Sequence, residues 1–216
     1  MHLRLLVLAA ALLPLPARAQ DPMDAVSELF EEVNSVAFYT HAATLASDGE
    51  LEGVLSGVGL EVFLNLPSVG KAEFELGLGA NTLSGFEAVE PSLDLRGQIR
   101  TLPTLAIYGV LDSTAVVEPY LGLQFGVAEL WNTRGYAEDG TIYEAGSETF
   151  ELGVVGGGYL DAGPLRGLYA EVAFRRRRFE SVTWGEAETL PEGWPRAIDA
   201  STWSVTLGWQ FRIRDK

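Results

Sequence analysis

Large apolar side chains occupy every second position close to the end of the chain. In the stretch STWSVTLGWQFRI, residues 201–213, these positions are Trp203, Val205, Leu207, Trp209, Phe211 and Ile213. Most of the residues between them are small or polar. A period of two is typical of a β-strand with one apolar and one polar face. The apolar face packs either against a second sheet or against lipid, and the rest of the chain has to distinguish these two environments.

Alternation of the same kind, interrupted by clusters of turn-forming residues, predicts eight strands. They span residues 36–46, 54–66, 71–83, 95–110, 118–131, 149–160, 167–179 and 201–213. Each is longer than the typical strand of a soluble sheet, which has about five or six residues. A tilted strand needs about nine to eleven residues to cross a bilayer. Strand length therefore favours an all-β fold, an eight-stranded antiparallel up-and-down transmembrane β-barrel.

One predicted strand contains a residue that disturbs regular pairing. Pro103 lies inside the strand expected at 95–110. Proline has no backbone N–H to donate to the neighbouring strand. We therefore expect a bulge or a local break at this position.

Loop lengths alternate along the chain in a way that favours the same architecture. The first, third, fifth and seventh connections are long and acidic, whereas PSVG, LDSTAVV and DAGPLRG are short. Barrels of the bacterial outer membrane have short periplasmic turns and longer external loops. We expect the acidic loops to face outward, where they offer a surface for an unidentified extracellular ligand.

The N-terminus has the order of features found in a secretory signal peptide. A basic residue, Arg4, precedes an apolar run and the small-residue site Ala17-Arg18-Ala19. This predicts a signal peptide at 1–19, a short amphipathic leader at 20–34 and a barrel domain at 35–216. No later apolar stretch approaches the length of a spanning helix, so any membrane span has to consist of strands.

Composition excludes several other classes of function. The net charge of −15 argues against nucleic acid as a partner, because a polyanion would be repelled. Cysteine is absent, and His41 is the only histidine beyond the signal peptide. Metal clusters and Cys/His nucleophile pairs are therefore not expected. We predict no catalytic residue, no cofactor and no metal site, and we interpret His41 as a plain strand residue.

Charged residues on the face assigned inward are balanced in sign. Eight strands leave an interior that side chains just fill, and buried opposite charges are tolerated when they pair. We expect a packed polar core with small water pockets rather than a general porin. The predicted lumen network comprises Glu61, Glu73, Glu75, Arg96, Arg100, Glu151, Glu171, Arg175, Arg177 and Arg212.

The basic run FRRRRF at 174–179 divides between the two faces of its strand. Alternation assigns Arg175 and Arg177 to the inward face and Arg176 and Arg178 to the outward face. At the external rim, guanidinium groups are suited to bind the phosphates of lipopolysaccharide. We predict a lipopolysaccharide contact at Arg176 and Arg178, and a solvated rim is the alternative.

The C-terminal TLGWQFRI resembles the β-signal by which outer-membrane barrels are recognised by the barrel assembly machinery. The residues that carry the resemblance are Thr206, Gly208, Phe211 and Ile213. Together with the signal peptide and the eight strands, they make the chain similar to the small OmpA/OmpX-type outer-membrane β-barrel family. The resemblance implies the outer membrane of a Gram-negative-type bacterium, lipid and lipopolysaccharide as surroundings, and a lipid-facing apolar surface.

These observations favour a non-enzymatic outer-membrane barrel with a structural or surface-binding role. A lipid-modifying barrel enzyme and a small narrow pore are the alternatives.

Overall fold

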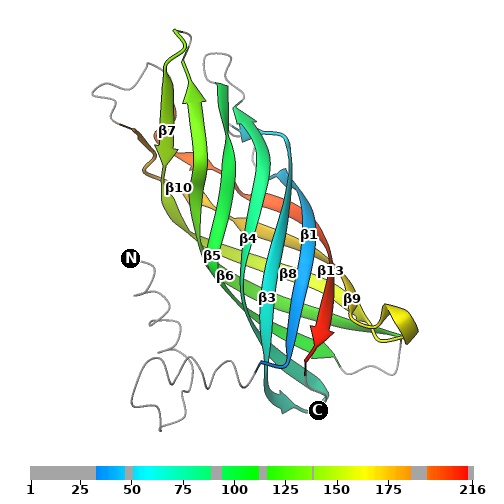
Figure 1. Ribbon diagram of the computed structural model, residues 1–216. Coiled ribbons are helices and arrows are strands. Elements are labelled where there is room, and N and C mark those ends of the chain that lie inside the picture. The colour runs from blue at the N-terminus through cyan, green and yellow to red at the C-terminus, as the bar shows by residue number, and fades with distance from the viewer. Residues whose placement is uncertain are drawn as a thin grey trace.

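A computed structural model describes residues 33–46, 51–88, 94–111, 116–137, 139–185 and 194–213 of the chain. These residues form a closed barrel of eight antiparallel strands (Figure 1). The predicted fold class is confirmed, and each predicted strand corresponds to one strand of the wall. The wall strands are β1 (Ser35–Leu45), β3 (Val54–Val69), β4 (Ala72–Ala88), β5 (Asp94–Leu111), β6 (Val117–Tyr136), β8 (Glu148–Leu160), β9 (Leu168–Arg176) and β13 (Thr202–Arg212).

Consecutive wall strands are neighbours all the way around the barrel. The hydrogen-bonded order runs from β6 through β5, β4, β3, β1, β13 and β9 to β8, and pairing of β6 with β8 closes the ring. The first and last strands pair from Ser35 opposite Arg212 to Leu45 opposite Thr202. Because closure leaves no free sheet edge among these strands, their central backbone groups are satisfied within the wall.

The two ends of the barrel differ in their connections. The connections after β3, β5 and β8 are short, and we call this side the short-turn end. The connections after β1, β6 and β9 are longer, whereas the third predicted loop is reduced to the five residues between β4 and β5, because these strands extend beyond their predicted bounds. These four connections lie at the opposite side, which we call the long-loop end. The first and last residues of the barrel wall, Ser35 and Arg212, lie at the short-turn end. Among the described residues the only helix is the single turn η1 (Gly163–Leu165), and none is long and apolar enough to cross a membrane.

Five short strands among the described residues extend the long-loop end, and the alternation pattern predicted only one of these segments, Arg178–Phe179, as the end of the strand expected at 167–179. They are β2 (Leu51–Glu52), β7 (Ile142–Gly146), β10 (Arg178–Phe179), β11 (Thr183–Trp184) and β12 (Ile198–Asp199). Residues 133–136 at the end of β6 pair with β7, which in turn pairs with β11. Strands β10 and β12 form a separate pair. Two segments expected to be plain loops, β7 and β11, therefore continue the sheet of the wall.

The predicted irregularity at Pro103 is confirmed. The pairing of β5 with β6 shifts in register between Thr101 and Thr104, and the Leu102–Pro103 peptide bond is cis. On both sides of the shift the buried residues face inward, with Thr101 before it and Thr104 after it. Because one residue is inserted, odd-numbered residues of β5 face inward before the shift and even-numbered residues face inward after it.

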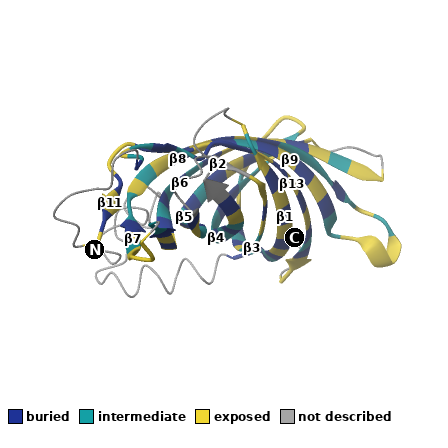
Figure 2. Cartoon of the chain, turned by 90° about the horizontal axis from the view of Figure 1, so that it is seen from above, coloured by how far each residue is buried: buried dark blue, intermediate teal, exposed yellow. Residues whose placement is uncertain are grey.

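Burial alternates along the strands and separates an outer from an inner face (Figure 2). On β13 the outward residues Trp203, Val205 and Leu207 are more than half exposed, whereas the intervening Ser204 and Thr206 are buried. The predicted apolar face of this strand therefore lies on the outside of the barrel.

The interior is filled in three layers along the barrel axis. An apolar cluster fills the long-loop end, and it contains Leu95, Ile99, Phe179, Trp184, Trp194 and Ile198. An aromatic cluster fills the short-turn end, and it contains Tyr39, Phe63, Tyr108, Tyr120, Tyr159 and Tyr169. Buried charged residues lie between the two clusters.

The predicted signal peptide at 1–19 lies outside the described residues, as does the leader except for Val33 and Asn34. These two residues are not helical.

Candidate functional site

The middle layer of the interior contains three carboxylates and two guanidinium groups. Glu61, Glu151, Glu171, Arg175 and Arg177 are all at most 6 % exposed. Their inward orientation follows from strand alternation, because each faces the interior opposite small or polar neighbours. Charges this deeply buried are tolerated only when they are paired and hydrogen-bonded.

Arg175 is the hub of this layer. Its Nε donates to Gln124 Oε1 at 2.9 Å, its Nη1 to Ser204 Oγ at 2.5 Å and its Nη2 to Glu171 Oε1 at 3.4 Å. Glu151 Oε1 lies 3.9 Å from its Nε. The planar guanidinium therefore joins side chains of β6, β8, β9 and β13 across the barrel.

Arg177 and Glu151 form a second centre beside the first. Arg177 donates from Nε to Glu151 Oε2 and from Nη1 to Thr202 Oγ1 at 2.9 Å. Thr101 Oγ1 donates to the same Glu151 oxygen at 3.0 Å. Glu151 is thereby held between β5 and the basic run.

Glu61 extends the network to the opposite wall. Tyr108 donates its hydroxyl hydrogen to the Glu61 carboxylate, with both oxygens at 3.1 Å, and Gln124 Nε2 donates to the Tyr108 oxygen at 3.1 Å. Tyr120 similarly donates to Glu171 Oε2 at 3.1 Å. A continuous chain of contacts therefore spans the lumen from β3 to β9 and β13. We call these side chains the lumen network.

Glycines on the inward face make room for the aromatic layer. A Cβ at Gly59 would lie 2.1 Å from the Tyr39 ring, and a Cβ at Gly208 would lie 2.4 Å from the Tyr169 ring. Each tyrosine ring thus occupies the space beside the glycine that lies opposite it on the neighbouring strand. The tyrosine sites were missed from the sequence, although glycine recurring on the polar face was the signal for them.

The structure does not bring all predicted lumen residues together. The inward placement of Arg96 and Arg100 was wrong: both precede the register shift of β5 and face outward. Glu73 is exposed, whereas Glu75 is half-buried and lies opposite the inward-facing Tyr108 of β5, as predicted. Arg212 lies at the mouth of the short-turn end, where its Nη2 is 4.0 Å from Glu118 Oε2.

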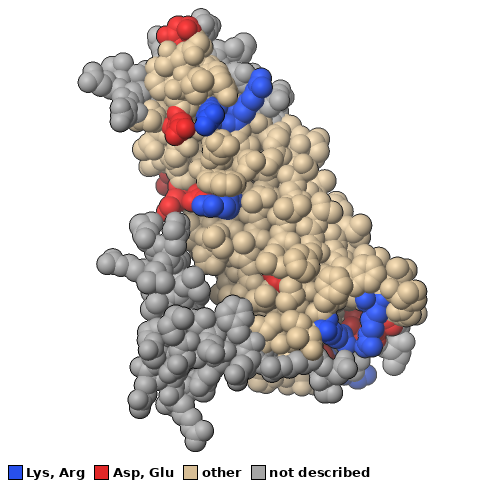
Figure 3. Space-filling view, viewed as in Figure 1, with Lys and Arg blue, Asp and Glu red and all other residues tan. Residues whose placement is uncertain are grey.

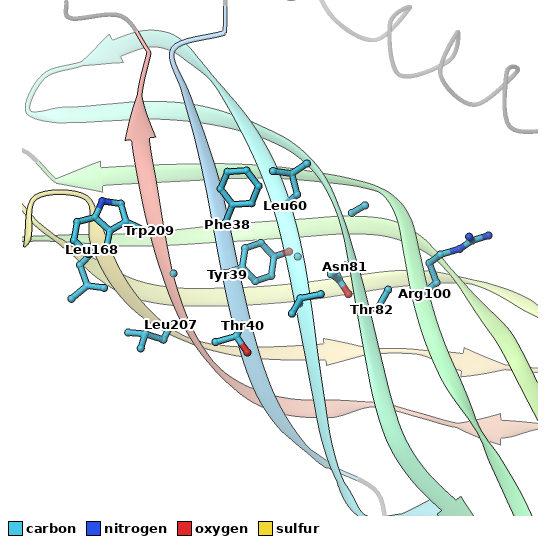
Figure 4. Close-up of a pocket in the computed structure, with 14 residues that line it drawn as sticks. Phe38, Tyr39, Thr40, Leu60, Asn81, Thr82, Arg100, Leu168, Leu207 and Trp209 are labelled. Carbon is cyan, nitrogen blue, oxygen red and sulfur yellow. The ribbon is translucent and has the colours of Figure 1, made fainter.

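Arg100 belongs instead to a polar cluster on the outer wall. It forms an ion pair with Glu129 of the adjacent strand, and its guanidinium lies 4.7 Å from the centre of the Trp131 ring. In Figure 4 Arg100 extends from β5 at one side of an apolar groove of about 690 Å³ lined by Phe38, Leu60, Leu207 and Trp209. Glu129, which also faces outward, is therefore paired with the guanidinium of Arg100.

The outer wall is otherwise dominated by uncharged residues. On the face shown in Figure 3 these residues form a broad band, and charged atoms gather mainly toward the two ends. Exposed apolar side chains occur around the ring, on seven different strands: Phe38, Val58, Ile107, Leu121, Val154, Val172 and Val205. The barrel is therefore apolar outside and charged inside.

The outward half of the basic run borders a groove at the long-loop end. Arg176 and Arg178 are exposed, whereas Arg175 and Arg177 are buried, as alternation predicts. The groove has a volume of about 650 Å³ and is also lined by Glu148, Phe150, Leu152 and Glu180. Arg176 lies opposite Leu152 on the adjacent strand, so guanidinium and apolar surface are continuous here.

His41 lies inside the barrel rather than at a surface. Its Nε2 is 2.9 Å from the backbone oxygen of Thr82, and its ring packs beside Tyr39 at a centroid distance of 5.7 Å. Within the described ranges no group of three or more metal-ligating side chains occurs.

The residues of the predicted assembly signal divide between the two faces. Thr206 and Gly208 face the interior, and Phe211 and Ile213 are exposed.

A scan against protein-family models finds no match, and a search of the curated proteins finds none either. Solved structures of β-barrels do match. Neisserial surface protein A is 13 % identical with a TM-score of 0.49, and the match covers 83 % of this chain and 96 % of that one. Ail of Yersinia pestis is 13 % identical with a TM-score of 0.47, covering 83 % and 99 %. The N-terminal β-barrel domain of Pseudomonas aeruginosa OprF is 12 % identical with a TM-score of 0.44, covering 83 % and 98 %.

Proposed function

We propose that this chain is an outer-membrane β-barrel with a structural or surface-binding role, a closed lumen and an external rim that binds lipopolysaccharide. The observation that carries the proposal is the inverted distribution of polarity. Five charged side chains are buried in the lumen, while apolar side chains such as Val58, Leu121 and Val205 are more than 60 % exposed outside. A soluble barrel would expose its charges and bury these residues.

The dimensions of the wall support a membrane as the surrounding solvent. Outward residues of β6 run from Leu121 through Leu123, Phe125 and Val127 before the first charge, Glu129. An outer-membrane barrel carries an apolar band about 25 Å tall between two aromatic girdles. Trp131, Phe150 and Trp203 lie toward one edge of the band, and Trp209 and Phe211 lie toward the other. Lipid is the environment that such a surface fits.

The lumen network supports a role other than free diffusion of solutes. Arg175 and Arg177 contact partners from four of the eight wall strands, and packed clusters lie on both sides of them along the barrel axis. An interior of eight strands has room for side chains and little else. We infer that the barrel does not act as a general porin.

The groove beside Arg176 and Arg178 supports binding of an amphiphile with a phosphate group. Two exposed guanidinium groups lie beside Phe150 and Leu152, which continue into the apolar band. Guanidinium groups bind phosphate through charge-assisted hydrogen bonds, and the apolar residues offer a surface to an acyl chain. Lipid A has both components.

Binding of purified lipopolysaccharide to the refolded barrel tests this role. Replacing both residues, Arg176→Gln and Arg178→Gln, should weaken binding roughly tenfold or more, because two charge-assisted contacts are lost. The control is Arg134→Gln, which removes an exposed arginine elsewhere at the long-loop end. Equal affinity of the double variant and the wild type would contradict the lipopolysaccharide site. Lipopolysaccharide that has been dephosphorylated should bind the wild type as weakly as the intact form binds the double variant.

A further inference from the structure

A notch in the wall opens at the short-turn end, between the end of β13 and the turn that joins β8 to β9. Its volume is about 280 Å³, and its polar lining includes Glu118, Asp161, Arg166 and Arg212. Figure 3 shows basic and acidic atoms gathered together at the lower right end of the barrel. None of these four residues lines the groove beside Arg176 and Arg178, and none belongs to the lumen network around Arg175.

Backbone geometry creates the notch. Gly167 has a φ of +88°, and a Cβ at this position would lie 2.2 Å from the backbone oxygen of Gln210. Gly167 donates its N–H to Leu160 O at 2.9 Å and accepts a hydrogen bond from Gln210 N at 2.8 Å. The turn is thereby tied to β13 at one point and diverges from it beyond that point, which leaves a space between Arg166 and the end of β13.

The charges that line the notch are mixed rather than of one sign. Arg166 Nε lies 2.7 Å from Asp161 Oδ1, and Arg212 Nη2 lies 4.0 Å from Glu118 Oε2. The side chains of both arginines are at least half exposed. Exposed ion pairs contribute little to stability and exchange partners readily. An incoming ligand can therefore replace each partner with one of like charge.

The notch is also continuous with the outer wall. Trp209 and Phe211 line it, and their rings stack at a centroid distance of 6.2 Å on the outward face of β13. Aromatic side chains at this level are typical of the boundary between hydrocarbon and headgroups. A ligand in the notch would thus have its polar part among the four charged residues and its apolar part against the band.

We propose that this notch binds the headgroup of a zwitterionic phospholipid of the phosphoethanolamine type. The phosphate accepts hydrogen bonds from Arg166 and Arg212, and the ammonium group donates to Asp161 and Glu118. An anionic phospholipid would satisfy the arginines but would place no cation beside the carboxylates. A choline headgroup has a cation without N–H donors. The volume is slightly below the range of about 300–1,000 Å³ usual for ligand pockets, so it suits a headgroup rather than a whole lipid.

This inference rests on the proposed membrane location, and the test separates the two. The delipidated, refolded barrel is titrated in detergent with phosphatidylethanolamine, phosphatidylglycerol or phosphatidylcholine of identical acyl chains, and bound lipids are counted by native mass spectrometry. The wild type should retain one phosphatidylethanolamine roughly tenfold more tightly than either other lipid. Equal retention of all three lipids would overturn the proposal and requires no variant.

Variants assign the two halves of the headgroup to their partners. Glu118→Gln with Asp161→Asn should remove the preference for phosphatidylethanolamine over phosphatidylglycerol, whereas Arg166→Gln with Arg212→Gln should weaken both lipids. The matched control, Arg134→Gln with Glu144→Gln, removes an exposed ion pair at the opposite end and should leave the preference unchanged. A preference that survives both notch variants would overturn the site. Failure of the wild type to insert into any bilayer would overturn the membrane location as well, whereas insertion without a preference would overturn only this inference.

Discussion

Arg177 donates from Nε to Glu151 inside the barrel, and neither side chain has any exposed surface. Glu151 lies on β8, and Arg177 lies in the segment directly after β9. Thr101 donates a further hydrogen bond to Glu151, and Thr202 accepts one from Arg177. This pair separates the apolar cluster at the long-loop end from the aromatic cluster at the short-turn end. Its integrity is therefore the most direct measure of how the interior is held together.

Breaking the pair from one side should destabilise the barrel strongly. Glu151→Gln leaves Arg177 with no anionic partner at its Nε in an interior without bulk water, and loss of one partner of a buried pair costs about 3–5 kcal/mol. Urea unfolding of the protein in vesicles measures the change in free energy of unfolding. Glu148→Gln, an exposed carboxylate on the same strand, is the control and should change stability little. A loss from Glu151→Gln no larger than that of the control would mean that the pair is not buried.

Replacing Gly208 by alanine should reduce the free energy of unfolding of the barrel. The Cβ of Gly208→Ala would approach within 2.4 Å of the Tyr169 ring, and overpacking of this kind costs about 1–3 kcal/mol. Gly156→Ala is a matched control, because its Cβ would meet Leu121 at an ordinary 3.6 Å. Combining Gly208→Ala with Tyr169→Ser should recover part of the loss. Equal stability of the two alanine variants would show that the ring does not cover Gly208.

The outward ion pair of Arg100 and Glu129 marks one edge of the apolar band. If it lies at the membrane interface, Glu129→Gln should cost about 1 kcal/mol or less, because an arginine there still reaches headgroups and water. An arginine at the bilayer midplane costs about 2–4 kcal/mol. Equilibrium unfolding in vesicles distinguishes the two depths. A loss above about 2 kcal/mol would place the pair within the hydrocarbon and move the edge of the band.

The filled interior should block ion flow. Planar-bilayer recordings of the refolded wild type should show no steady porin-like conductance, because the lumen network lies between two packed clusters in an interior that side chains fill. Arg175→Ala removes the hub of that network, so small intermittent openings should become more frequent. Large, steady currents through the wild type would contradict the closed lumen.

The strands could be predicted from the sequence because their signal is local. Alternation and turn residues suffice to locate all eight wall strands, and on β13 they also assign the faces correctly. On β5 the faces could not be assigned throughout, because one bulge at Pro103 reverses the parity of every residue on one side of it. Arg96 and Arg100 were placed inside for that reason, and only the register with β6 corrects them.

The apolar cluster at the long-loop end could not be predicted because its members are distant in sequence. Trp184 and Trp194 lie in an acidic stretch that is typical of a solvent-exposed loop. In the structure their ring centroids lie 4.7 Å apart, and the indole N–H of Trp184 donates a hydrogen bond to Pro195 O at 2.9 Å. Burial of these rings depends on packing against residues such as Leu95 and Ile99, which are distant in sequence and which no local pattern indicates.

The central claim is that lipid covers the outside of this barrel, and single-cysteine scanning of β13 tests it most directly. The chain contains no cysteine, so each introduced residue carries the only spin label. In proteoliposomes, labels at the outward positions Val205 and Leu207 should be accessible to molecular oxygen and inaccessible to a water-soluble nickel chelate. Labels at the inward positions Ser204 and Thr206 should be inaccessible to both. Outward labels that collide freely with the nickel chelate would show that water, not lipid, covers this face and would contradict the account.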